Sequence, residues 1–280
     1  MSRAKATTPT FEKERDMLIV GERINATRKR IGEAVQNGDA EHIKEEAVKQ
    51  VEAGSDYIDV NGGIPGKEID LLPWLVDVVQ EVVDVPVCLD SADPEAIKAA
   101  LPHCKQPPMI NSITFEEDRL EKMTPLARES GARVIALCMS DDGPPKGLED
   151  RIEIASRLVD RLTEDGIELE NIHVDPCVFP VSTDSAAATW VLDAVGHIRS
   201  QYPGIHTICG ASNVSFGLPQ RKILNAVFLP MLIARGLDSA ITDPCNKLIR
   251  ANLFAAEVLA GRDEFCVNYI GAFRAGTLEV

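Results

Sequence analysis

The sequence contains few aromatic residues and histidines, and its cysteines are not closely paired. Phe, Trp and Tyr make up 5% of the 280 residues, and there are five histidines and seven cysteines. No two cysteines form a C-x-x-C pair, so the spacing indicates neither a zinc site nor a disulfide framework. We therefore expect reduced thiols that pack as small apolar side chains, and no metal bound to this chain.

A long apolar segment is also missing. No apolar run reaches the roughly 20 residues that a membrane-spanning helix needs, and the polar residues 1–16 contain no apolar core of a signal peptide. We expect a cytoplasmic protein without a membrane partner, in which residues 1–16 form a flexible N-terminal arm and residues 17–280 a single domain. The net charge of −15 would repel phosphate backbones, so nucleic acid is not an expected partner.

Short apolar runs alternate with helical patterns along the whole chain. Eight such runs are expected to be strands: Met17–Val20, Asp56–Val60, Pro86–Leu89, Pro108–Asn111, Arg133–Met139, Asn171–Val174, Ile205–Cys209 and Ser239–Thr242. Eight strand–helix units could form a closed barrel or an open doubly wound sheet. The number of units favours a single-domain α/β protein with a (β/α)₈ TIM barrel. The absence of a G-x-G-x-x-G fingerprint from residues 21–26, after the first strand, also argues against the open, doubly wound sheet.

The helical segments between these runs carry recognisable start and stop signals. Asp39 can cap a helix that runs through Val51, and Asp93 followed by Pro94 is typical of another helix start. Gly131 is placed to end the helix before it. Three later helices are expected over residues 183–200, 220–235 and 246–260.

An Asp or Asn stands at the carboxyl end of nearly every apolar run: Asn25, Asp59, Asn61, Asp90, Asn111, Asp175, Asn213 and Asp243. Any one of them could simply cap a helix, as Asp93 does. In a barrel, however, all of them converge on the rim where active sites lie. Carboxylates and carboxamides suit a flat heterocycle that is rich in N–H groups and ring nitrogens. The rim is short of Arg, Lys and His, and no run of glycines forms a phosphate cradle, so a phosphorylated substrate is not expected. His173 is expected to be a core residue.

Five motifs carry a resemblance to a known family. They are Gly21-Glu22-Arg23-Ile24-Asn25, Leu89-Asp90-Ser91, Met109-Ile110-Asn111-Ser112, Asp175-Pro176 and the segment from Ser212 to Pro219 that reads SNVSFGLP. In this order they resemble the pterin-binding methyltransferases, from about Met17 to the C-terminus. That family includes the methyltetrahydrofolate:corrinoid/iron–sulfur protein methyltransferases and the folate domain of cobalamin-dependent methionine synthase. Dihydropteroate synthases are more distant relatives.

The resemblance implies a TIM barrel, usually a homodimer, that transfers a methyl group between N5 of tetrahydrofolate and the cobalt of a corrinoid. It implies that Asp90, Asn111 and Asp175 hold the reduced pterin, with Asp59 nearby. Asn213, on a loop after the seventh strand, would reach N5 of the pterin. The sequence has no corrinoid-binding Asp-x-His-x-x-Gly pattern, so the cobalamin would be carried by a separate protein.

Two alternatives remain open. A dihydropteroate synthase would need a phosphate-binding loop after the first strand, and the stretch Ala26-Thr27-Arg28-Lys29-Arg30 is basic but lacks the pattern of that loop. A non-catalytic pterin-binding module would be favoured by loss of the asparagine near N5, yet Asn213 is present.

Overall fold

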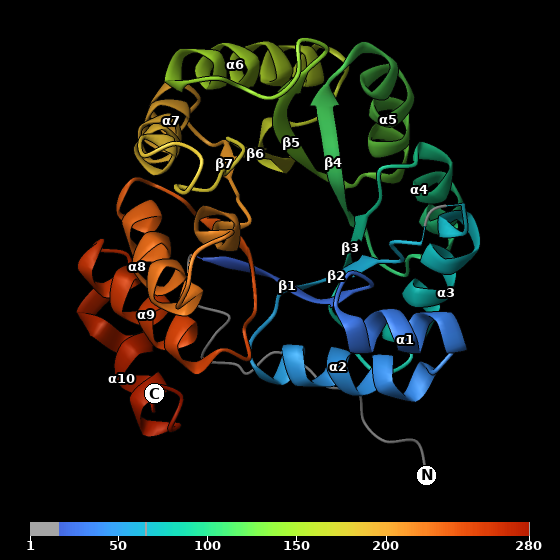
Figure 1. Cartoon of the computed structure of the whole chain (residues 1–280), viewed down its shortest axis with the longest axis horizontal. Coiled ribbons are helices and arrows are strands. Elements are labelled where there is room, and N and C mark those ends of the chain that lie inside the picture. Colours follow the sequence, from blue (N-terminus) through green and yellow to red (C-terminus); the bar gives the residue numbers. More distant parts are fainter. Residues whose placement is uncertain (1–16, 65, 280) are drawn as a thin grey trace.

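Eight parallel strands follow one another around a barrel, with helices on the outside (Figure 1). The computed structural model describes residues 17–64 and 66–279, so the arm expected for residues 1–16 lies outside the described residues. The strands are β1 Leu18–Asn25, β2 Tyr57–Asn61, β3 Val87–Asp90, β4 Met109–Phe115, β5 Arg133–Ser140, β6 Ile172–Asp175, β7 His206–Thr207 and β8 Ser239–Thr242. Each of the eight expected strands is present.

The barrel closes between its seventh and eighth strands through a short contact. Strand pairing runs without interruption from β7 back to β1 and on to β8. Between β7 and β8 the Ile241 amide donates a hydrogen bond to the Cys209 carbonyl at 3.1 Å. Gly210 and Ile241 also form an isolated parallel β-bridge there. The expected (β/α)₈ TIM barrel is thus confirmed, with β7–β8 as its loosest seam.

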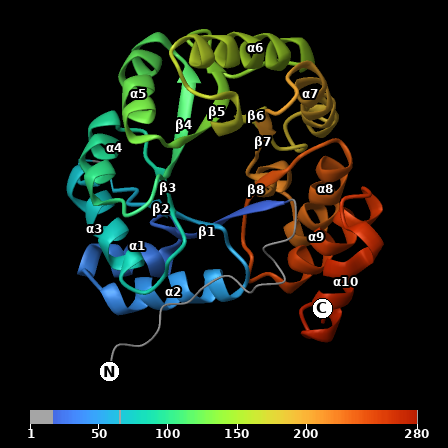
Figure 2. The same cartoon turned by 180° about the vertical axis from the view of Figure 1, so that it is seen from behind.

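The helices surround this barrel, which is also visible from the opposite side (Figure 2). They are α1 Lys29–Asn37, α2 Ala40–Glu52, α3 Glu68–Gln80, α4 Pro94–Ala100, α5 Glu117–Ser130, α6 Leu148–Glu164, α7 Ala187–Gln201, α8 Arg221–Ala234, α9 Lys247–Leu259 and α10 Val267–Arg274, with short 3₁₀ turns η2 Leu101–His103, η3 Leu169–Asn171, η4 Ala211–Ser215 and η5 Glu264–Cys266. None of the helices in the described part of the chain is long and apolar enough to cross a lipid bilayer.

The predicted helix signals act as expected. The Asp39 side chain accepts a hydrogen bond from the His42 amide, and Asp93 accepts one from the Glu95 amide. Gly131 ends α5 in the left-handed conformation, at φ 63°. Local capping therefore fixes where these helices begin and end.

Two strands are longer than their apolar runs. β1 continues beyond Val20 to Asn25, and β4 continues beyond Asn111 to Phe115. The residues added to each strand include polar side chains, because they lie at the open end of the barrel. Hydrophobicity alone therefore places the ends of these strands too early.

The barrel interior below the mouth is filled by apolar side chains. Val20, Tyr57, Cys88, Met109, Ile135 and Ile208 form one buried cluster there. His173 is fully buried beside them, as expected of a core residue, and its Nδ1 lies 2.9 Å from the Ser239 Oγ. Because these side chains fill the barrel interior, a ligand can enter the barrel only at the carboxyl ends of the strands.

Candidate functional site

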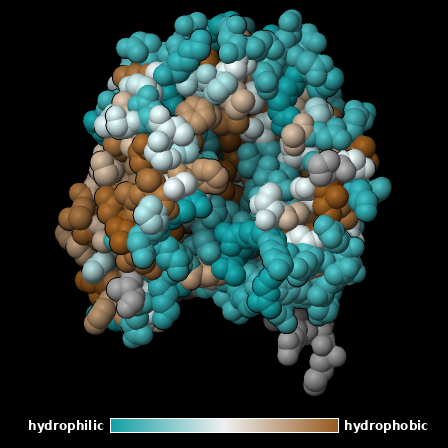
Figure 3. Space-filling model, in the orientation of Figure 1, coloured by the Kyte–Doolittle hydropathy of each residue, from teal (hydrophilic) through white to brown (hydrophobic). Residues whose placement is uncertain are grey.

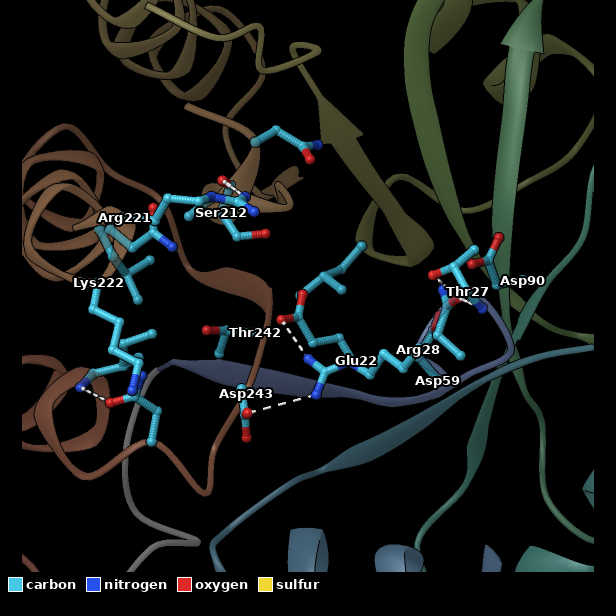
Figure 4. Close-up of a pocket in the computed structure, with 18 of the residues that line it drawn as sticks. Glu22, Thr27, Arg28, Asp59, Asp90, Ser212, Arg221, Lys222, Thr242 and Asp243 are labelled. Atoms are coloured by element: carbon cyan, nitrogen blue, oxygen red, sulfur yellow. Dashed lines mark hydrogen bonds and ion pairs between the residues drawn. The ribbon is translucent and has the colours of Figure 1, made fainter. Parts of the chain in front are cut away.

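A cavity of about 510 Å³ opens at the carboxyl ends of the strands. Four of the five residues expected to form the site lie in its wall: Asp59 from β2, Asp90 from β3, Asn111 from β4 and Asn213 from η4. The first and last strands, α8 and the start of α9 complete the lining. Residues far apart in the sequence thus meet at one rim, as the barrel requires (Figure 4).

One end of the cavity is acidic and buried. Asp90 Oδ2 accepts a hydrogen bond from Asn61 Nδ2 at 2.7 Å, and Asp59 Oδ1 accepts one from Asn111 Nδ2 at 3.4 Å. Burial raises the pKa of Asp59 well above its usual range, and the charge of Asp90 adds to that increase. Burial also raises the pKa of Asp90. This end of the cavity can therefore accept hydrogen bonds and also retain a proton at a higher pH than an ordinary carboxyl group.

An ion-pair network lies in the middle of the cavity. Arg28 Nη2 lies 3.2 Å from Glu22 Oε1, and Arg28 Nη1 lies 3.8 Å from Asp243 Oδ2. Burial raises the pKa of Glu22, although Arg28 acts in the opposite direction. Arg28 is therefore partly neutralised by the two carboxylates beside it.

The opposite end of the cavity is basic, which corrects the expectation that the rim is short of Arg and Lys. Arg221 and Lys222, from the first turn of α8, lie across the cavity from Asp59 and Asp90 (Figure 4). Arg221 donates hydrogen bonds to the Ser212 carbonyl at 2.8 Å and to Ser215 Oγ at 3.1 Å. A search for polar residues at strand ends misses these cations, because they start a helix rather than end a strand.

Asn213 is exposed at the mouth of this cavity. It lies outside any strand, in the connection between β7 and α8, as expected, and within that connection it belongs to the short 3₁₀ turn η4. Its amide donates to the Gly210 carbonyl at 3.2 Å, and its carbonyl accepts from the Phe216 amide at 3.1 Å. Its side-chain carboxamide has no hydrogen-bond partner among the described residues, so that group is free to bind a ligand.

Asp175 is the one expected site residue that is not in the cavity wall. Its Oδ1 accepts a hydrogen bond from the Cys177 amide at 2.8 Å, and the Gly210 amide also hydrogen-bonds to this carboxylate. Gly210 directly precedes η4, which carries Asn213. The Asp175 carboxylate thus connects the end of β6 to the segment that presents Asn213.

Burial raises the pKa of Asp175 to about 7, although the amides of Cys177 and Gly210 and the charge of Arg151 act in the opposite direction. Because its pKa is higher in the folded protein than the usual 3.8, the group stabilises the fold at low pH. That contribution decreases as the pH rises from about 4 to about 7. At neutral pH and above, the ionised carboxylate therefore carries a cost of burial.

We accordingly expect Asp175→Asn to raise stability more at pH 8 than at pH 5. One unit of pKa corresponds to about 1.4 kcal/mol, so the advantage of the variant should grow by roughly 2 kcal/mol between these pH values. Urea unfolding of both proteins at both pH values measures this difference. The exposed Asp142→Asn serves as the control, and equal pH dependence of the wild type and Asp175→Asn would contradict the prediction.

The sequence of the chain is similar to that of known proteins. The family model described as "Pterin binding enzyme" matches residues 21–243. The chain is 36% identical over 265 residues to the methylcorrinoid:tetrahydrofolate methyltransferase of Eubacterium limosum, covering 94% of this chain and 98% of that protein. It is 29% identical to the methionine synthase of Mycobacterium leprae, covering 90% of this chain but only 22% of that longer protein.

Solved structures agree in fold. A dihydropteroate synthase of Yersinia pestis with a pterine-sulfa conjugate superimposes with a TM-score of 0.69 at 16% identity, covering 92% of this chain and 98% of that one. The dihydropteroate synthase of Thermus thermophilus gives a TM-score of 0.65 at 18% identity, covering 87% of this chain and 94% of that one. At these identities the likeness concerns the barrel and not the reaction.

Proposed function

Because the chain belongs to the family of pterin binding enzymes, we propose that it is a methyltetrahydrofolate–corrinoid protein methyltransferase. It transfers a methyl group, in either direction, between N5 of tetrahydrofolate and the cobalt of a corrinoid carried by a separate protein. The observation that carries this proposal is the similarity to the methyltransferase of Eubacterium limosum over nearly the full length of both chains. The pterin-binding methyltransferase domain in this proposal spans residues 17–280.

The acidic end of the cavity fits a reduced pterin. Asp59, Asp90 and Asn111 offer carboxylate and carboxamide oxygens to the N–H groups of a flat heterocycle. Asp175, which binds backbone amides here, is proposed to support pterin binding from beneath η4. We propose that the pterin binds without a metal ion, so its affinity should be the same in buffer with and without a chelator.

Asn213 is proposed as the catalytic residue. When the methyl group leaves N5, negative charge builds on that nitrogen, so a hydrogen bond from the Asn213 carboxamide becomes stronger in the transition state. The carboxamide cannot itself release a proton at neutral pH. The buried carboxyls of Asp59 and Asp90, whose pKa values are raised, can hold the proton that N5 finally requires.

A methyl-transfer assay tests the proposed function. The purified protein is incubated with methylcobalamin and tetrahydrofolate, and in the reverse direction with 5-methyltetrahydrofolate and cobalt(I) corrinoid. We expect the corrin absorbance to report methyl transfer in both directions. Binding of tetrahydrofolate without transfer would instead indicate a binding module, and formation of dihydropteroate from a pterin diphosphate would indicate a synthase.

The seven cysteines, all within the described residues, are free thiols. This supports a reducing compartment, which we propose is the cytoplasm.

We also propose that the protein is a homodimer. On α8, Ile223, Val227 and Met231 are four residues apart and are 60%, 56% and 46% exposed. Further exposed apolar side chains lie close by on α9 and at the C-terminal end of the chain, and apolar residues cover this flank of the molecule (Figure 3). An apolar face of this kind on a surface helix is typical of a protein interface.

Val227→Glu is therefore expected to convert the dimer to a monomer, because it buries a charge in the apolar contact. Light scattering coupled to size exclusion measures the mass. Ile69→Glu, at a position that is 50% exposed on α3, provides a control that should remain dimeric. A monomeric wild type, or a dimer that persists in Val227→Glu, would contradict this proposal.

A further inference from the structure

Arg119, in the first turn of α5, binds three backbone carbonyl groups next to the acidic end of the cavity. Its Nε donates to the Ser112 carbonyl at 2.8 Å, its Nη1 to the Ala92 carbonyl at 2.6 Å and its Nη2 to the Ser91 carbonyl at 3.0 Å. All three guanidinium nitrogens are thus used, and Arg119 itself does not line the cavity. No carboxylate of the described residues forms an ion pair with it, so this cation is spent on the backbone.

The strand pairing accounts poorly for these carbonyls. The pairing of β3 with β4 ends at Asp90, opposite Asn111, so Ser91 and Ala92 lie beyond it. In β4, Ser112 is skipped in the pairing with β5. Ser91 and Ser112 are both buried, and the carbonyl of a buried residue needs a hydrogen-bond partner. Arg119 supplies that partner at the point where the strand ladder becomes irregular.

The bound carbonyls belong to the segments that carry two residues of the proposed pterin site. Asp90 directly precedes Ser91, and Asn111 directly precedes Ser112. The Ser91 amide also donates to the Asn111 carbonyl at 3.3 Å, which joins the two segments a second time. Asp90 and Asn111 both line the cavity, and Asp90 is seen at its acidic end in Figure 4. Rotation of the peptides that Arg119 holds would turn these two side chains away from a ligand.

The charge of Arg119 acts on Asp90 as well. The titratable groups near Asp90 are Asp59 of β2, Cys88 of β3, Glu68 of α3 and Arg119 of α5. Burial raises the pKa of Asp90 and the charge of Glu68 adds to the increase, whereas the hydrogen bond from Asn61 and the charge of Arg119 lower it. Arg119 therefore favours the ionised form of Asp90, which is the better hydrogen-bond acceptor.

We propose that Arg119 is a positioning residue of the pterin site, whose guanidinium holds the segment after β3 against β4 so that Asp90 and Asn111 point together at the pterin. This inference deepens the proposed function and rests on it, since it concerns the same site. Three carbonyls at fixed angles require the planar fork of an arginine, because a lysine ammonium is a single point charge on a flexible stem. Arg119 acts through Asp90 and Asn111 and does not touch the ligand.

Calorimetry with tetrahydrofolate on the complete protein tests this inference through two substitutions. Arg119→Lys keeps the charge but loses the planar fork, and Arg119→Gln loses both. At pH 8 we expect both variants to bind tetrahydrofolate about tenfold more weakly than the wild type, because Asp90 and Asn111 are no longer held in place.

The pH profile of the affinity distinguishes this role from a merely structural one. In Arg119→Gln the midpoint of the profile should move to higher pH, because the cation that lowers the pKa of Asp90 is removed. In Arg119→Lys the midpoint should stay near that of the wild type. The matched control is Arg128→Gln in the last turn of α5, where Arg128 is exposed and donates to the Asp165 carbonyl at 3.4 Å. It should keep both the affinity and the midpoint.

The outcomes separate the two proposals. If the wild type does not bind tetrahydrofolate, the proposed function is wrong and the inference falls with it. If the wild type binds, only the present inference is overturned by a folded Arg119→Lys of wild-type affinity, or by a folded Arg119→Gln whose midpoint does not move to higher pH. Thermal unfolding shows which variants are folded. If Arg119→Gln does not fold, the affinity of Arg119→Lys at pH 8 decides alone.

Discussion

Asn213→Ala is expected to slow methyl transfer about 10²-fold or more, while it weakens pterin binding about tenfold or less. The reason lies in how N5 changes during the reaction. In bound 5-methyltetrahydrofolate, N5 is a tertiary amine and a weak acceptor, so the Asn213 carboxamide contributes little to binding. As the carbon–nitrogen bond breaks, charge develops on N5 and the same hydrogen bond strengthens. A contact made mainly in the transition state lowers the rate constant and leaves the dissociation constant almost unchanged.

Single-turnover transfer to cobalt(I) corrinoid and calorimetry with 5-methyltetrahydrofolate measure the two constants separately. Asn213→Asp is the matched variant, because it keeps the shape of the side chain but replaces the amide donor with a second acceptor. We expect Asn213→Asp to be at least as slow as Asn213→Ala. If the rate and the affinity of Asn213→Ala fall in equal proportion, Asn213 is an ordinary binding residue. If Asn213→Asp transfers the methyl group rapidly, the reaction does not need an N–H donor at this position.

The fold could be predicted from the sequence because its signals are local. Each strand is an apolar run of a few residues, and the helices between them carry their own caps, such as Asp39 and Asp93. The polar residues near the carboxyl ends of the apolar runs that form β2, β3 and β4 follow from the same pattern, since parallel strands bring their carboxyl ends to one rim. The strand pattern alone therefore suffices to place Asp59, Asp90 and Asn111 together.

Side-chain direction and long-range contacts could not be predicted in this way. Asp175 ends a strand like the others, but its carboxylate is bound by the Cys177 amide, where Cys177 has a left-handed φ of 63°. Arg221 and Lys222 reach the cavity because η4 and the start of α8 lie over the barrel mouth, and no local pattern specifies that position. The basic stretch after Asn25 is visible in the sequence, but the cavity of about 350 Å³ that it lines together with residues of α2 becomes evident only once α1 and α2 are packed together.

The acidic end of the cavity leads to a second large effect, which concerns pterin affinity. We expect Asp90→Ala to weaken binding of tetrahydrofolate by about 1–3 kcal/mol, because a buried pterin N–H would lose its acceptor. The wild-type affinity should also depend on pH. Burial raises the pKa of Asp90, and the ionised form is the better acceptor, so affinity should fall as the pH drops through a midpoint above the usual range of an aspartate.

The conservative variant Asp90→Asn separates charge from shape. Its side chain can still accept the hydrogen bond from Asn61 Nδ2, but it no longer adds a negative charge beside Asp59. Asp90→Asn no longer titrates at this position, so the pH dependence that Asp90 produces should be lost in this variant. The charge of Asp90 is one of the causes that raise the pKa of Asp59, so any step that remains, from Asp59, should lie at lower pH than the wild-type midpoint. Calorimetry between pH 5 and pH 8 measures the profiles, with Asp142→Asn as the control and thermal unfolding as the test of folding. If folded Asp90→Ala binds tetrahydrofolate like the wild type, or Asp90→Asn keeps the wild-type midpoint, the pterin does not lie against Asp90.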